Sequence, residues 1–113
     1  MKKDNKVYIK DMLDAVDQIL EYCDDCDYIK FTNTKMIQDA VIRNLEILGE
    51  AATNLSGDFA GEHPNLPVKK ARGMRNLLIH HYDFVDVDEV WKVIEKDLLP
   101  LQKELQKILK ELK

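Results

Sequence analysis

Residues that interrupt helices are scarce in this chain, which has 4 glycines and 3 prolines among 113 residues. Folds made of many short strands need frequent glycine- and proline-rich turns, so this scarcity favours a few long helices. Apolar residues also recur at spacings of three and four, as expected for helices that bury one face. Between Val7 and Cys23 this apolar stripe consists of Tyr8, Ile9, Met12, Val16, Ile19, Leu20 and Cys23. The pattern predicts an amphipathic helix over this segment.

Two further helices are expected in the middle of the chain. After an irregular stretch over residues 24–31, the segment Thr32-Asn33-Thr34 offers N-cap side chains for a helix that ends near Ser56-Gly57. The apolar stripe of this helix is Ile37, Val41, Leu45, Leu48, Ala52 and Leu55. Residues 58–67 contain two of the prolines and are predicted to form a loop. A third helix is expected from Val68 to His80.

The last helix has both a start signal and a possible interruption. The segment Asp86-Val87-Asp88-Glu89 has the form of a capping box, with Asp at the cap and Glu three residues later. Pro100 is expected to kink the helix, because proline lacks an N–H and its ring clashes with the preceding turn. Apolar residues form a heptad seam at Ile94, Leu98, Leu101, Leu105, Ile108 and Leu112. This seam fits either packing on the chain's own core or contact of its end with a second chain.

These elements predict one all-α domain spanning residues 1–113, an up-and-down bundle of four main helices with the last helix kinked at the proline. A composition of 45% hydrophobic and 34% charged residues is typical of a soluble, helix-rich globular protein. No apolar run approaches the roughly 18–20 residues that a bilayer-spanning helix needs. We therefore expect a cytoplasmic protein with no membrane partner.

Cys23 and Cys26 form a C-x-x-C pair, which is half of a zinc site. No second pair follows, and no βαβ pattern suggests a thioredoxin-like redox motif. The flanking aspartates should raise the thiol pKa and so lower the reactivity of the pair. We expect two reduced thiols at a helix end, with no metal and no cofactor; a metal or redox site is the minor alternative.

The charge of the chain is unevenly distributed. The formal net charge is −4, from 17 basic and 21 acidic residues, which argues against general attraction to nucleic acid. The segment from Lys69 to Tyr82, however, contains four basic residues and no acid, which leaves −8 for the rest of the chain. A concentrated basic patch in an acidic protein is a candidate anion site.

The third helix has two unlike faces. At about 100° per residue, an apolar side contains Ala71, Met74, Leu77, Leu78 and His81, and the opposite side contains Arg72, Arg75, Asn76, Ile79 and His80. Two guanidiniums, an amide and an imidazole can therefore converge. The alternative is an ordinary surface helix with solvated arginines. Ile79 on the polar face is a candidate dimer-interface residue. Glu46 and Glu50 are either acids satisfied in the core or partners of these arginines.

The spacing Arg75, four residues, His80, one residue, Tyr82 resembles the signature of HepT-type toxins in the HEPN superfamily of all-helical ribonucleases. Residues 39–52 resemble the second-helix pattern of this family, and residues 85–101 resemble its last helix, including the proline. The resemblance thus covers nearly the whole chain. Val68 departs from it, because an aromatic residue is expected after Pro67, and we expect the change to affect packing more than chemistry.

The resemblance implies a metal-independent endoribonuclease in which Arg75 and His80 are the catalytic pair. His80 suits proton transfer near neutral pH, and Arg75 suits a bidentate contact with phosphoryl oxygens. Asn76 would position His80 or the phosphate, and Arg72 would add positive charge. One histidine does not readily serve as base and acid together, so a homodimer is expected, with Ile79 at its interface.

The resemblance also implies the toxin half of a type VII-like toxin-antitoxin pair. Its partner would be a minimal nucleotidyltransferase that transfers AMP to the motif tyrosine, Tyr82. The added phosphodiester charge would occupy the arginines and exclude RNA. Two alternatives remain: a non-catalytic helical regulator of a nucleotidyltransferase, and a nucleotide-binding helical bundle.

Overall fold

Helices make up all the regular secondary structure in the part of the chain that the computed structural model describes, residues 4–79 and 86–112, with the side chains of 76–79 excluded. They are α1 (Asn5–Tyr22), α2 (Tyr28–Asn33), α3 (Lys35–Thr53), α4 (Gly57–Glu62), α5 (Val68–Ile79), α6 (Val87–Lys96) and α7 (Leu98–Leu112). This confirms the all-α prediction. No helix among the described residues is long and apolar enough to cross a membrane.

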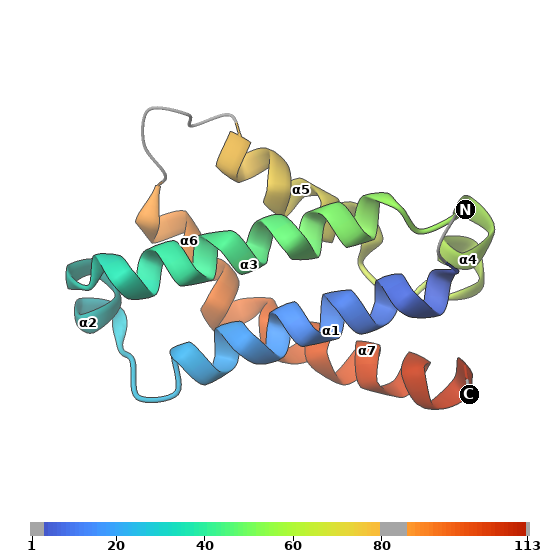
Figure 1. Cartoon of the computed structure of the whole chain (residues 1–113), viewed down its shortest axis with the longest axis horizontal. Coiled ribbons are helices and arrows are strands. Elements are labelled where there is room, and N and C mark those ends of the chain that lie inside the picture. Colours follow the sequence, from blue (N-terminus) through green and yellow to red (C-terminus); the bar gives the residue numbers. More distant parts are fainter. Residues whose placement is uncertain (1–3, 80–85, 113) are drawn as a thin grey trace.

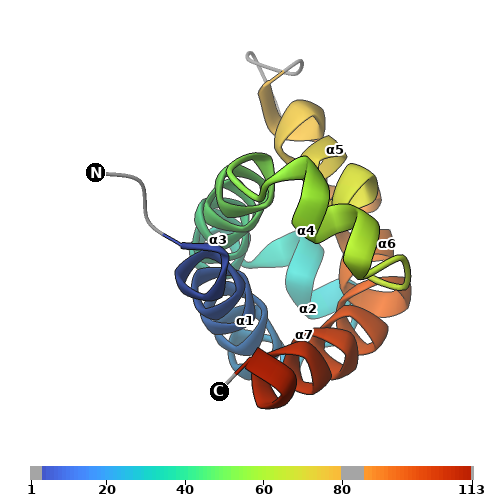
Figure 2. The same ribbon diagram turned by 90° about the vertical axis from the view of Figure 1, so that its right-hand side faces the viewer.

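The long helices run alternately up and down (Figure 1). The first leads away from the end where both termini lie, α3 returns, α5 leads away again, and α6 followed by α7 returns. Seen end-on, these four stretches surround the centre, and the short helices α2 and α4 lie toward opposite ends of the bundle (Figure 2). The four-helix, up-and-down architecture expected from the sequence is therefore present.

The apolar stripes predicted from the spacing form the core. Side chains from α1, α3 and α7 are fully or nearly fully buried, and α2, α4, α5 and α6 add further residues. The largest fully buried side chains are Phe31, Ile9, Met12, Ile19, Leu45, Leu48, Leu98, Leu105 and Ile108. No polar or charged residue among the described ones is buried. Burial of apolar surface therefore holds the long helices together.

Residues 24–31 were expected to be irregular, but part of this stretch is helical. A short helix, α2, begins here at Tyr28, because the Asp27 side chain accepts a hydrogen bond from the Lys30 backbone N–H at 2.8 Å. Phe31 anchors it in the core, with its ring centroid 5.4 Å from that of Trp91. Because α2 is a single short segment, its apolar residues show no clear repeat in the sequence.

The predicted cap of the second helix is also wrong in detail. Thr32 and Asn33 lie within α2 and donate hydrogen bonds to the Ile29 carbonyl, at 3.1 and 2.8 Å. Thr34 occupies the N-cap position of α3, but its side chain makes no capping hydrogen bond. Thr32 and Asn33 thus belong to the end of α2, and only Thr34 lies at the start of α3.

A short helix also replaces part of the loop predicted over residues 58–67. The Ser56 side chain accepts a hydrogen bond from the Phe59 backbone N–H at 3.1 Å and so caps α4. Phe59 is buried and anchors this turn of helix to the core. The third predicted helix begins at Val68, as expected, and Val68 is itself buried.

The last predicted helix is divided into α6 and α7 close to Pro100. The Asp86 side chain accepts hydrogen bonds from the backbone N–H groups of Asp88 and Glu89, which confirms the predicted cap of α6. The helix breaks at Asp97, and Pro100 lies in the first turn of α7. A proline removes the bond to the carbonyl four residues earlier and clashes with that carbonyl. For Pro100 this is the carbonyl of Lys96, the last residue of α6.

The heptad seam of α6 and α7 packs on the chain's own core. Ile94, Leu98, Leu101, Leu105 and Ile108 are buried, and α7 packs along α1. Leu112, the last residue of the seam, is half-buried. The first of the two interpretations of the seam is therefore confirmed, and contact with a second chain remains a prediction.

The helices α3 and α5 approach each other closely at Gly49. A Cβ atom added at Gly49 would overlap the Cβ of Arg75 and lie 3.1 Å from the Arg75 backbone nitrogen. Gly49 lies inside α3 and is buried, so the glycine is required by this close approach of a neighbouring helix.

Arg72 makes the second contact between these helices. Its Nε donates to the Ala52 carbonyl at 3.1 Å, and one terminal nitrogen lies 3.4 Å from the Leu55 carbonyl. Carbonyls at a helix C-terminus lack partners within the helix and attract cations. Arg72 therefore caps the C-terminal end of α3.

We predict that Gly49→Ala lowers the free energy of unfolding by about 1–3 kcal/mol, because the new methyl group forces α3 and α5 apart. Gly73→Ala is the matched control, since nothing lies within 4 Å of a Cβ added at Gly73 in α5. This control should stabilise the protein by up to about 1 kcal/mol, through the higher helix propensity of alanine. Urea unfolding followed by circular dichroism measures both changes, and equal stabilities of the two variants would contradict the packing described here.

We also predict that Arg72→Ala lowers the free energy of unfolding by about 1–2 kcal/mol, because carbonyls of α3 lose a charged donor. Arg72→Lys keeps the positive charge near the helix end but lacks the fork that serves two carbonyls, so its loss should be smaller. The same urea titrations measure this series. A lysine variant as unstable as the alanine variant would show that the charge contributes nothing.

Candidate functional site

The structure describes part of the predicted site. Arg72 and Arg75 lie on α5, and both reach α3. Asn76 and Ile79 belong to the backbone of α5, but their side chains lie outside what the structure describes. His80 and Tyr82 lie outside the described residues altogether. The convergence of arginine, amide and imidazole therefore remains a prediction.

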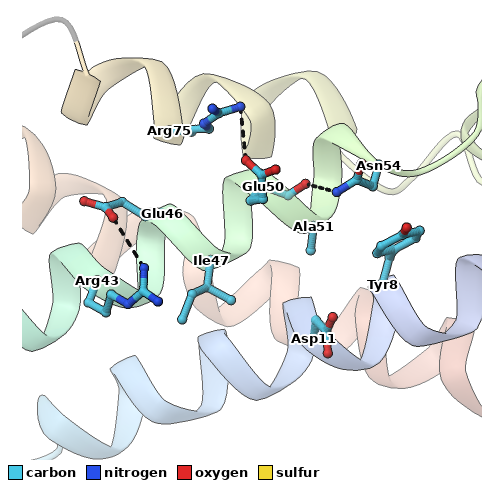
Figure 3. A pocket seen from close by; sticks show the side chains of 9 residues that line it. All are labelled: Tyr8, Asp11, Arg43, Glu46, Ile47, Glu50, Ala51, Asn54 and Arg75. Atoms are coloured by element: carbon cyan, nitrogen blue, oxygen red, sulfur yellow. Dashed lines mark hydrogen bonds and ion pairs between the residues drawn. The ribbon is translucent and has the colours of Figure 1, made fainter. Parts of the chain in front are cut away.

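Arg75 forms an ion pair with Glu50 on the neighbouring helix (Figure 3). Its Nη1 lies 3.2 Å from Glu50 Oε2, and the two side chains are 40% and 58% exposed. An exposed pair of this kind contributes about 0–1 kcal/mol to stability. Glu50 is therefore a partner of a third-helix arginine, one of the two roles left open from the sequence. The adjacent Gly49 brings the backbone of Arg75 against α3 and so places the guanidinium beside this carboxylate.

Arg72 lies one turn earlier on α5 and has a different partner. Arg72 is half-buried, and its guanidinium lies on the carbonyls of Ala52 in the last turn of α3 and of Leu55 just beyond it, rather than being solvated on an outer face. The two arginines predicted to act together thus have different partners: Arg72 binds carbonyl groups near the end of α3, and Arg75 binds the exposed Glu50 carboxylate. Of the pair, Arg75 is the one that borders an open groove.

This groove, of about 600 Å³, lies between α1 and α3, with Arg75 reaching it from α5. Figure 3 shows that α1 supplies Tyr8 and Asp11 on one side and α3 supplies most of the other. The lining residues are Tyr8, Asp11, Arg43, Glu46, Ile47, Glu50, Ala51, Asn54 and Arg75. Two arginines and three acids line it, so the groove is not a uniformly basic channel. An anion that enters this groove therefore meets carboxylates as well as guanidiniums.

Sequence reasoning did not identify Arg43 or Tyr8 as groove residues. Arg43 pairs with Glu46 at 3.7 Å on the same helix, so Glu46 is not a partner of a third-helix arginine. Their spacing of three residues could have predicted this ion pair, because residues three apart lie side by side on the surface of a helix. Tyr8, by contrast, fits the apolar stripe of the first helix, and only the packing of α1 on α3 shows that it borders the groove.

The local excess of positive charge is partly compensated in the fold. Lys70 Nζ lies 2.6 Å from Asp97 Oδ1, at the break between α6 and α7. Lys70 and Arg75 therefore face carboxylates, and Arg72 faces carbonyl groups. The excess of positive charge counted over residues 69–82 therefore overstates the number of cations that are free to bind an external anion.

The Cys23 and Cys26 pair lies at the end of α1, and both thiols are free and partly buried. Burial, reinforced by the neighbouring Cys26 thiol, raises the pKa of Cys23 to about 11. The direction agrees with the sequence-based expectation, but the cause is burial rather than the flanking aspartates. Because the thiolate is the reactive form, this raised pKa makes Cys23 a poor nucleophile near neutral pH. Within the described residues, no group of three or more His, Cys, Asp or Glu side chains is arranged to hold a metal.

Comparison with known proteins places this helical fold in a family. The family described as "Ribonuclease HepT-like" matches residues 12–108. A Methanocaldococcus jannaschii protein named as a candidate RNase is 41% identical over 105 residues, which cover 93% of this chain and 96% of that protein. A Thermococcus cleftensis protein named "Probable ribonuclease HepT" is 38% identical over 110 residues, 97% of this chain and 100% of its own length.

A less similar relative also matches over nearly the full length of both chains. A protein of Caldanaerobacter subterraneus subsp. tengcongensis, also named as a candidate RNase, is 32% identical over 109 residues, 96% of this chain and 97% of its own. No solved structure shows a significant match to this chain. The family match and the relatives together cover nearly every element described above. The chain therefore belongs to the HepT-like ribonuclease family.

Proposed function

We propose that this protein is a metal-independent endoribonuclease of the HEPN type and the toxin of a type VII-like toxin-antitoxin pair. Membership in the HepT-like ribonuclease family supports the activity. The observation that carries the site assignment is the placement of Arg75: its side chain is 40% exposed and lines the groove, while its backbone is held against α3 at Gly49. A positioned, accessible guanidinium is suited to bind the non-bridging oxygens of a phosphodiester.

The proposed chemistry is transesterification within RNA. The ribose 2′-oxygen loses its proton and attacks phosphorus, and the bond to the 5′-oxygen breaks as that oxygen gains a proton. The products are a 2′,3′-cyclic phosphate and a 5′-hydroxyl end. Arg75 stabilises the charge that develops on the phosphoryl oxygens, and His80 transfers one of the two protons. Asn76 positions the phosphate or the imidazole, and Arg72, engaged as a helix cap, contributes long-range charge.

A homodimer supplies the second proton-transfer group in this proposal. Cleavage needs a base and an acid, and a single imidazole does not readily act as both in one step. Two copies of α5 facing one another across a two-fold axis would bring two His80 side chains to one phosphodiester. Ile79, on the same predicted face, would be covered by the partner copy.

Regulation is proposed to act through Tyr82, two residues after His80. A cognate minimal nucleotidyltransferase would transfer AMP from ATP to the Tyr82 hydroxyl, which forms a phosphodiester and releases pyrophosphate. The neutral hydroxyl thereby becomes an anion close to the arginine and histidine proposed to bind RNA. Charge repulsion and occupation of the guanidinium would then exclude the RNA backbone.

We predict that His80→Ala and Arg75→Ala each abolish RNA cleavage and growth inhibition, because they remove the proton-transfer group and the charge stabiliser. Cleavage of a labelled RNA in excess chelator, followed on denaturing gels, measures the effect. Wild-type activity should persist in chelator. Circular dichroism should show that both variants keep the helical fold, since the Arg75 ion pair is exposed.

Two results would contradict this assignment. Equal cleavage by the wild type and His80→Ala in chelator would exclude the proposed mechanism. Wild-type protein that binds a nucleotidyltransferase but cleaves no RNA would instead favour the non-catalytic regulator.

For the modification, we predict that the cognate nucleotidyltransferase and ATP add mass in AMP increments to the wild type and add none to Tyr82→Phe. Modified wild-type protein should lose RNA cleavage. Intact-mass spectrometry with α-labelled ATP as a second readout measures the transfer, and Tyr8→Phe serves as the matched tyrosine control. Labelling that persists in Tyr82→Phe would assign the modification to another residue.

A further inference from the structure

An acidic side chain of the protein itself occupies the arginine proposed to bind the RNA phosphate. Glu50 Oε2 lies 3.2 Å from Arg75 Nη1, at the edge of the groove that RNA would reach. Glu50 is 58% exposed, and its side chain points from α3 toward the guanidinium (Figure 3). A carboxylate and a phosphodiester present the same chemistry to a guanidinium, namely paired oxygens that share a negative charge.

The surroundings make this carboxylate replaceable. Both members of the pair are solvent-accessible, so the contact is screened and contributes little to folding. The backbone of Arg75, in contrast, is fixed against α3 by the contact at Gly49. The Arg75 side chain therefore starts from a fixed point beside the groove, where an incoming phosphate would find its guanidinium already paired with Glu50.

We infer that Glu50 is an internal competitor for Arg75: it holds the guanidinium in the RNA-free protein and is displaced by the RNA phosphodiester. This inference rests on the proposed function of Arg75. Glu50 is thus a residue that sets substrate affinity, and its negative charge weakens binding of any single phosphate. RNA that engages the site through several contacts displaces it, whereas an isolated phosphate does so poorly.

The test compares Glu50→Gln with the wild type. The amide keeps the size of the side chain and an oxygen that accepts a hydrogen bond, but it removes the competing charge. Binding of a fluorescein-labelled 2′-O-methyl RNA, which lacks the attacking hydroxyl, is measured by anisotropy at low salt. We expect Glu50→Gln to bind about 2–5-fold more tightly, and the difference to shrink as ionic strength rises.

Glu46→Gln is the matched control, because it removes the same charge from the same helix one turn earlier. Glu46 pairs with Arg43 at 3.7 Å rather than with Arg75, so its effect should be smaller than that of Glu50→Gln. If both variants gained the same RNA affinity, the cause would be the general change in groove charge, and the inference would be overturned.

Steady-state cleavage gives a second, independent readout. Competition predicts that Glu50→Gln lowers KM while kcat stays within about twofold of the wild type. A fall in kcat at unchanged KM would show that Glu50 orients Arg75 for the reaction, which overturns competition. Equal RNA affinity of the wild type and Glu50→Gln refutes this inference alone. Failure of both proteins to bind RNA refutes the ribonuclease proposal with it.

Discussion

The contact between Gly49 and Arg75 is the constraint on which the candidate site depends. Two helices approach so closely there that any side chain at position 49 would overlap the Arg75 side chain. This approach places Arg75 beside the Glu50 side chain and places Arg72 beside the carbonyls at the end of α3. One interface therefore sets both the stability of the α3 and α5 pair and the position of the guanidinium at the groove.

Charge in this protein has to be counted at the scale of single side chains. A net charge of −4 argues against nucleic acid, and the excess of basic residues on the third helix argues for an anion site. The fold shows that neither count describes what an external phosphate would meet. Lys70 faces Asp97, Arg72 faces carbonyls and Arg75 faces Glu50. Of these three cations, Arg75 is the one that lines the groove, where Glu50 is its ion-pair partner.

The sequence predicted the long elements because their signals are periodic and repeated. The stripes of α1, α3 and α7 are buried as expected, and the Asp86 cap and the interruption near Pro100 lie where local chemistry places them. The short helices α2 and α4 were missed because each is held by one cap and one buried aromatic, Phe31 or Phe59, which is too little to form a repeat. The pairing of Glu50 with Arg75 was left as one of two alternatives, because contacts between helices depend on register, which periodicity does not specify.

Arg72 and Arg75 show why the spacing of residues could not predict that the two arginines have different partners. They lie three residues apart on one face of α5 and are identical in chemistry, so a helical projection treats them as equivalent. What separates them is where α3 ends. The Ala52 carbonyl lies in the last turn of α3, which ends at Thr53, and it accepts from the Arg72 guanidinium as well as from the Leu55 backbone N–H. One turn further along α5, the neighbouring backbone is still helical and its carbonyls are occupied, so Arg75 meets a side chain instead. The end of one helix thus holds one arginine on backbone carbonyls and leaves the other beside a carboxylate at the groove.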